Sequence, residues 1–155
     1  MPPPTRAPIG LTLARTAKSV SGAFDDALAA AGGSLPIWLI LISLKTQRLG
    51  NQRELARAVG IQGATLTHHL NAMEASGLLT RRRHPDNRRV HIVEPTESGE
   101  ALFGRLRAAA AEFDRRLRAG LGDDEIAAIE RVLERLQRNV AGDSPDLSGE
   151  RRVRR

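Results

Sequence analysis

Residues 51–93 of this 155-residue chain read NQRELARAVGIQGATLTHHLNAMEASGLLTRRRHPDNRRVHIV. Two short helices are predicted here, and Gly60 separates them because glycine adopts the left-handed conformation that ends a helix most easily. The second helix is expected from Gly63 to Ser76, and a basic two-stranded hairpin follows it. This order of elements predicts a helix-turn-helix with a wing.

The first helix of this stretch has a clear start signal. Asn51 can accept a hydrogen bond from a free backbone N–H, and Glu54 three residues later can bond back, which is a capping-box arrangement. Leu55, Ala58 and Val59 then form an apolar stripe along one side. We therefore expect a short amphipathic helix that begins at residue 51.

The second helix is predicted to have one apolar and one small polar face. At about 100° per residue, Leu66, Leu70 and Met73 share a narrow side. The opposite side is free of acidic residues near its start, so it can approach a major groove and offer hydroxyl, imidazole and amide groups to bases. An ordinary solvated helix face is the alternative. The candidate contacts to bases or nearby phosphates are Thr65, Thr67, His68 and Asn71.

The hairpin is unusually rich in arginine. Residues 81–89 hold five arginines and one aspartate, and the Pro85-Asp-Asn87 sequence is a turn signal. Arginines at such a tip suit insertion into a minor groove, the role expected for Arg88 and Arg89, whereas Arg81 and Arg83 are candidate phosphate contacts. Alternate residues of one strand cannot all face DNA. A solubilising arginine surface is the alternative interpretation.

Charge is distributed unevenly along the chain. The net charge is +6, but residues 51–93 hold seven Lys/Arg against three Asp/Glu, and residues 94–149 hold eight against twelve. A basic unit followed by acidic helices would steer a polyanion to one side of the molecule.

The flanking segments complete a mainly α-helical chain with a small β-wing. Proline-rich residues 1–8 are expected to be a disordered tail, and residues 141–155 a basic flexible tail. Helical patterns cover residues 9–33 and 96–140, and Gly32 and Gly33 end the first of them. A nearly all-apolar helix that starts near Pro36 is expected at the centre of the fold, so the winged unit covers residues 34–95.

The sequence resembles the MarR family of winged-helix transcription regulators. The similar segments are residues 35–38, 55–61, 65–70, 73–78, 85–89 and 96–99, and the resemblance as a whole covers nearly all of residues 9–140. The chain departs from the family at Asn87, where an acid usually precedes the paired wing arginines, and at Pro95, where leucine is usual. Pro95 suggests that the last strand ends early.

The resemblance implies an obligate homodimer held by its terminal helices. The residues agree, since the apolar stripes of residues 9–33 and 96–140 exceed what one small winged domain can cover. A monomeric helical bundle is the alternative. The resemblance also implies a small-molecule pocket between the dimer helices and the winged unit, where Trp38 is a candidate ligand-binding residue, although tryptophan in such a position is more often part of the core.

Other chemistry finds little support. The chain has no cysteine and no catalytic constellation or phosphate loop, so we expect no enzyme and no cofactor. All four histidines lie between His68 and His91, but the two on the helix point about 100° apart, so no metal site is expected. No signal core or apolar run of about 20 residues appears, which predicts a cytoplasmic protein without membrane contact.

These observations predict a homodimeric, sequence-specific regulator of transcription. It should bind a pseudo-palindrome in double-stranded DNA, most simply as a repressor that a small aromatic or anionic effector releases. The alternative is a winged-helix module for protein–protein contact that does not bind DNA.

Overall fold

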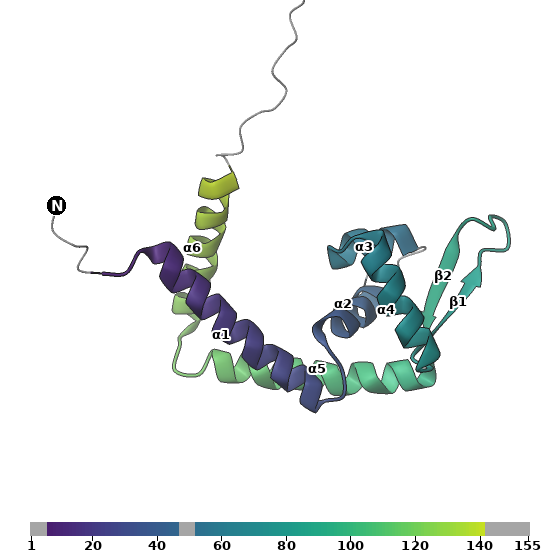
Figure 1. Cartoon of the computed structure of the whole chain (residues 1–155). Coiled ribbons are helices and arrows are strands. Elements are labelled where there is room, and N and C mark those ends of the chain that lie inside the picture. Colours follow the sequence, from purple (N-terminus) through teal and green to yellow (C-terminus); the bar gives the residue numbers. More distant parts are fainter. Residues whose placement is uncertain (1–5, 47–51, 142–155) are drawn as a thin grey trace, which may run out of the picture. The chain divides into compact units, whose positions relative to one another are not determined.

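The computed structural model describes residues 6–46 and 52–141. The chain divides into two units, Met1–Asp114 and Arg115–Arg155, which are described separately. The elements, shown in Figure 1, are α1 (Ile9–Ala30), α2 (Leu35–Thr46), α3 (Gln52–Val59), α4 (Gly63–Ala75), β1 (Leu79–Arg83), β2 (His91–Pro95), α5 (Glu97–Leu117) and α6 (Asp123–Ala141). The mainly helical architecture with a two-stranded wing is confirmed. Asn51, residues 1–5 of the predicted N-terminal tail and residues 142–155 of the predicted C-terminal tail lie outside the described residues. The predicted domain boundaries stay a prediction.

Helix α2 is the central helix of the first unit. The Ser34 hydroxyl accepts a hydrogen bond from the Ile37 N–H at 3.4 Å, which caps the helix start. Ile40 and Leu41 are fully buried, and they join a core that α1, α3, α4, the wing and α5 complete. In the part of the chain that the structure describes, no single helix is long and apolar enough to cross a membrane. The pair α1 and α2 would qualify together by length and composition, but it is bent by 75° at its break.

The turn between α3 and α4 forms as the sequence predicts. Gly60 has φ +75°, and the Ile61 N–H donates to the Ala56 carbonyl at 3.2 Å, the hydrogen bond of a Schellman helix end. Helix α4 buries Leu66, Leu70 and Met73, the three residues predicted for its apolar face. Its opposite face is therefore directed away from the core.

The wing is a regular antiparallel hairpin, and one prediction about it is wrong. Strand β2 does not end early, because Pro95 is its last residue and pairs with Leu79. The Thr96 N–H donates to the Leu78 carbonyl and the His84 N–H to the Val90 carbonyl, so the hydrogen-bonded pairs alternate and Leu79–Pro95 falls between two of them. The missing N–H of proline costs no hydrogen bond at that place.

Helix α5 closes the core behind the wing. The Thr96 hydroxyl accepts from the Gly99 N–H at 3.1 Å, which caps the start of the helix, and it donates to the Gly77 carbonyl. Gly99 is buried against the Leu78 carbonyl, where a Cβ atom would collide with the backbone. Leu102 and Leu106 then fill the core. This joint fixes α5 to the base of the wing.

Helix α6 belongs to the second unit and is amphipathic without a buried residue. The Gly122 N–H donates to the Glu125 carboxylate at 2.8 Å, which caps the helix start. Ile129, Leu133 and Val140 are 45%, 39% and 73% exposed. The apolar stripe predicted from the sequence is therefore present and uncovered in a single chain.

Candidate nucleic-acid interface

The outward face of α4 is small, polar and exposed. Thr65, His68 and Asn71 are exposed, with small alanines around them, and Thr67 is half-buried. The core on the other side of the helix holds this face outward, so three of the four predicted base-contact residues present their side chains to solvent. The structure brings them together on one surface.

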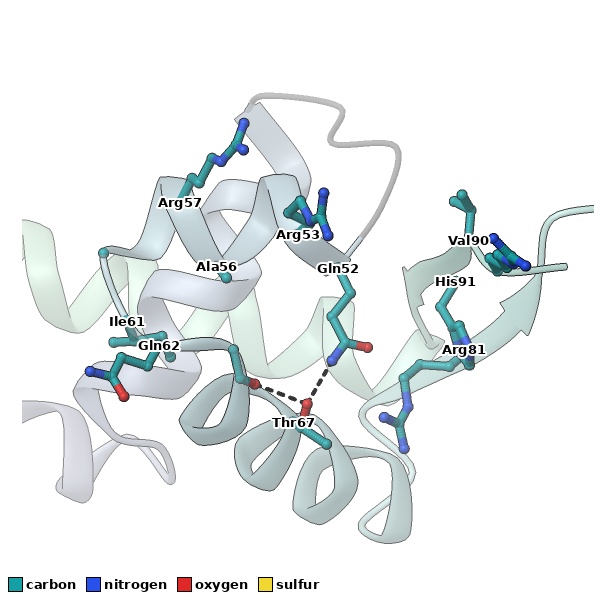
Figure 2. Close-up of a pocket in the computed structure, with 13 residues that line it drawn as sticks. Gln52, Arg53, Ala56, Arg57, Ile61, Gln62, Thr67, Arg81, Val90 and His91 are labelled. Carbon is teal, nitrogen blue, oxygen red and sulfur yellow. Dashed lines mark hydrogen bonds between the residues drawn. The ribbon is translucent and has the colours of Figure 1, made fainter. Parts of the chain in front are cut away.

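A basic cavity of about 1080 Å³ lies beside this face, between α3, the start of α4 and the wing (Figure 2). Four arginines and one histidine line it, and none of its lining residues is acidic. These basic residues are Arg53, Arg57, Arg81, Arg89 and His91. Such a concave, positively charged surface suits a phosphate backbone.

Sequence reasoning missed the α3 side of this cavity. Arg53 and Arg57 are both exposed, and they stand four residues apart on α3, a spacing that puts them on one helix face. That spacing is the signal in the sequence that indicates a basic face on α3. The two side chains extend the basic surface beyond the wing.

Thr67 is tied to the protein itself. Its hydroxyl donates to the Gly63 carbonyl at 2.9 Å and accepts from the Gln52 amide at 2.8 Å, as the dashed lines of Figure 2 show. A hydroxyl with these two partners fastens α3 to α4. A base contact through this oxygen would have only one acceptor site left.

Arg81 is held against α4. Its guanidinium donates to the Glu74 carboxylate at 2.7 Å and also to the Asn71 side-chain carbonyl. The hydrogen bond from the Arg81 side chain lowers the pKa of Glu74 below its ordinary value, and burial of the carboxylate opposes this effect. The predicted phosphate contact of Arg81 thus competes with a defined role inside the protein.

The other wing arginines lie outward. Arg83, Arg88 and Arg89 are exposed, which suits the contacts proposed for them. Asn87 shapes the tip, because its side-chain oxygen accepts from the Arg89 N–H at 3.2 Å and its backbone carbonyl accepts from the Val90 N–H at 2.9 Å. The residue that departs from the family pattern therefore forms the turn itself.

The remaining candidates lie elsewhere. Trp38 is half-buried and stacks on Phe103 with ring centroids 5.6 Å apart, so it packs against the core. His68 and His69 lie edge to face at 5.7 Å. Among residues 6–46 and 52–141, no three His, Cys, Asp or Glu side chains lie close enough to hold a metal ion.

Known proteins share this architecture. The sequence model of the MarR family matches residues 34–91. The chain is 30% identical to the solved transcriptional regulator PA3341, over 87% of this chain and 99% of that one, with a TM-score of 0.68. This chain belongs to the MarR family of DNA-binding transcriptional regulators.

Three other matches to this MarR chain are informative. The transcriptional repressor CouR, bound to a 23-mer DNA duplex, is 29% identical with a TM-score of 0.75, over 84% of this chain and 92% of that one. CouR from Rhodococcus jostii RHA1 bound to p-coumaroyl-CoA is 26% identical with a TM-score of 0.68, over 83% of this chain and 90% of that one. An uncharacterized HTH-type transcriptional regulator of Bacillus subtilis, YdgJ, is 28% identical over 90 residues, and the match spans 58% of this chain and 55% of YdgJ.

The family consists of transcriptional regulators rather than enzymes. The alternative prediction, a protein-interaction module that does not bind DNA, finds no support among these relatives.

Proposed function

We propose that this MarR-family protein is a homodimeric repressor of the cytoplasm that binds a pseudo-palindromic operator. Each α4 helix would enter a major groove, with Thr65, His68 and Asn71 facing the bases. The observation that carries the proposal is the exposed small face of α4 beside a cavity with four arginines and no acid.

The cavity would hold the sugar-phosphate backbone next to the groove that α4 reads. Arg53 and Arg57 approach from α3, and Arg89 approaches from the wing. Arg88 at the wing tip would enter or flank the neighbouring minor groove, and Arg83 would contact a phosphate. Phosphate contacts set the register and the salt dependence, whereas the α4 side chains select the sequence.

Dimerisation is supported by the uncovered apolar residues outside the winged unit. In α1, Ile9, Leu11 and Leu13 are 70%, 44% and 38% exposed, and α6 has no buried residue. A second copy can cover these faces by the symmetry that pairs two half-sites.

A small effector would release the operator. CouR of Rhodococcus jostii binds p-coumaroyl-CoA, which supports an aromatic or anionic ligand here as well. Trp38 would form one wall of its pocket. The protein would have one state that fits DNA and another that does not. The ligand must have the higher affinity for the second state, because only differential affinity shifts the equilibrium.

Selection of bound duplexes from a random pool tests the core of the proposal. The expected result is a pseudo-palindrome whose half-sites are about 10 base pairs apart from centre to centre. A pool that shows no enrichment at low salt would overturn the proposal, and an asymmetric single site would overturn the dimeric mode of binding.

Arg88→Ala tests the wing. It should weaken binding to every duplex and reduce the slope of log K against log salt by about 0.9, because one phosphate contact is lost. His68→Ala is the matched change on α4, and it should alter base preference with little effect on that slope. An unchanged slope for Arg88→Ala would remove this residue from the interface.

A further inference from the structure

Three residues tie the wing to the recognition helix α4. The Arg81 backbone N–H donates to Glu74 Oε1 at 3.2 Å, and its side-chain Nε donates to Glu74 Oε2 at 3.1 Å. Its Nη2 then bridges Glu74 Oε2 and Asn71 Oδ1. The Arg81 side chain is 17% exposed, whereas that of Arg82, which pairs with Glu94, is 55% exposed.

The chemistry of this network fixes how the Asn71 amide is turned. A guanidinium has only donors, so the Asn71 atom that faces it must be the carbonyl oxygen. Glu74 uses both of its oxygens to hold Arg81, which keeps the guanidinium beside Asn71. One lone pair of the Asn71 carbonyl is then taken by Arg81, whereas both donor hydrogens of the amide nitrogen remain for a base.

This orientation bears on which base Asn71 reads. Bidentate recognition of adenine by asparagine needs the carbonyl to accept from N6 and the amine to donate to N7. Guanine O6 and N7, and thymine O4, are acceptors and need only a donor. Because its carbonyl is already bound to Arg81, Asn71 should favour the guanine and thymine edges, which need only a donor.

We propose that Glu74 and Arg81 are positioning residues that turn Asn71 into a donor, so that Asn71 selects guanine or thymine rather than adenine. This inference rests on the proposed function. It gives Arg81 a part in sequence selection through another residue, in place of the phosphate contact that the sequence predicts.

The two roles of Arg81 leave different marks on binding. A phosphate contact contributes about 0.9 to the salt slope and nothing to base preference. A positioning residue leaves the slope unchanged and changes the preference at one base pair. The two Nη1 donors of Arg81 are not used in the bonds above, so the salt slope decides between these roles.

The test uses the full-length protein and the operator obtained by selection. Asn71→Ala identifies the base pair that Asn71 reads, because discrimination is lost only there. Affinities are then measured with each base at that position for wild type, Arg81→Met and Glu74→Gln, and Arg83→Met is the matched control on the same strand. Melting temperatures confirm that each variant folds, and Glu74→Gln preserves the side-chain shape if Arg81→Met does not fold.

We expect wild type to prefer guanine or thymine at this position. Both network variants should raise the affinity for adenine relative to the preferred base about fivefold or more, at an unchanged salt slope, and Arg83→Met should not. A wild-type preference for adenine would overturn the proposal. A reduced slope with unchanged preference in Arg81→Met, or no position that depends on Asn71, would do the same. A pool without any enriched sequence would instead overturn the proposed function.

Discussion

At the joint between α4 and the wing, the Arg81 side-chain hydrogen bond holds the pKa of Glu74 below its ordinary value. A carboxylate whose pKa is lower in the folded than in the unfolded chain contributes stability above the unfolded pKa, and that contribution is lost as the pH falls through the folded pKa. The difference in unfolding free energy between wild type and Glu74→Gln should therefore shrink from about pH 7 to about pH 3. Urea titrations at both pH values measure it, and an equal difference at the two would contradict the ion pair.

Gly99 allows α5 to approach the base of the wing. A Cβ at this position would overlap the Leu78 carbonyl, which also accepts the Thr96 N–H. Gly99→Ala should therefore lower the unfolding free energy by about 1–3 kcal/mol, since either backbone must move. Gly104→Ala is the matched control on the same helix, because nothing lies within 4 Å of its Cβ position. It should stabilise the protein by about 0.5–1 kcal/mol. Equal effects of the two substitutions in chemical denaturation would refute this account of Gly99.

Between α3 and α4, the Thr67 hydroxyl is the connecting group. Thr67→Val keeps the shape of the side chain but removes the acceptor of Gln52 and a donor to the Gly63 carbonyl, so it should cost about 1 kcal/mol of unfolding free energy. Thr65→Val, on the exposed face of the same helix, should change stability by less than about 0.5 kcal/mol. Its effect should appear in DNA binding. A stability loss that is equal for both would show that Thr67 does not join the helices.

The elements themselves could be predicted from local sequence. The spacing of Leu66, Leu70 and Met73 sets the buried face of α4, and Gly60 and Thr96 mark helix ends by backbone chemistry that needs no distant partner. Partners far apart in the chain could not be predicted in this way. The bonds of Arg81 to Asn71 and of Gln52 to Thr67 depend on how finished elements pack.

The same limit explains the error at Pro95. The missing backbone N–H of proline suggests a strand end. It costs a hydrogen bond, however, only where the proline falls at a hydrogen-bonded pair of the two strands. Only the register with β1 shows that it does not. Arg53 and Arg57 were missed for a related reason, because their meaning comes from the cavity they share with the wing.

For the molecule as a whole, the position of its positive charges should determine how strongly DNA affinity depends on salt. Arg57→Ala and Arg89→Ala, on opposite sides of the cavity, should each reduce the salt slope by about 0.9 and the double variant by about twice that. Arg131→Ala removes the same charge from the exposed surface of α6 and should leave the slope unchanged. If the three single variants reduced the slope alike, net charge rather than the cavity would govern binding.

The uncovered apolar stripe of α6 connects assembly to DNA affinity. Ile129 and Leu133 are 45% and 39% exposed in the single chain, and a second copy would remove them from water. The double variant Ile129→Glu, Leu133→Glu would place charge in that contact. It should sediment as a monomer, whereas wild type should sediment as the proposed dimer. One head then binds one half-site without the high local concentration of the other head, and affinity for the palindrome should fall about 100-fold or more. Gln137→Glu adds acid to an exposed position of the same helix and should change neither property. A double variant that remains dimeric would place the contact between copies on other surfaces, and one that is monomeric yet binds at full strength would show that the two heads act independently.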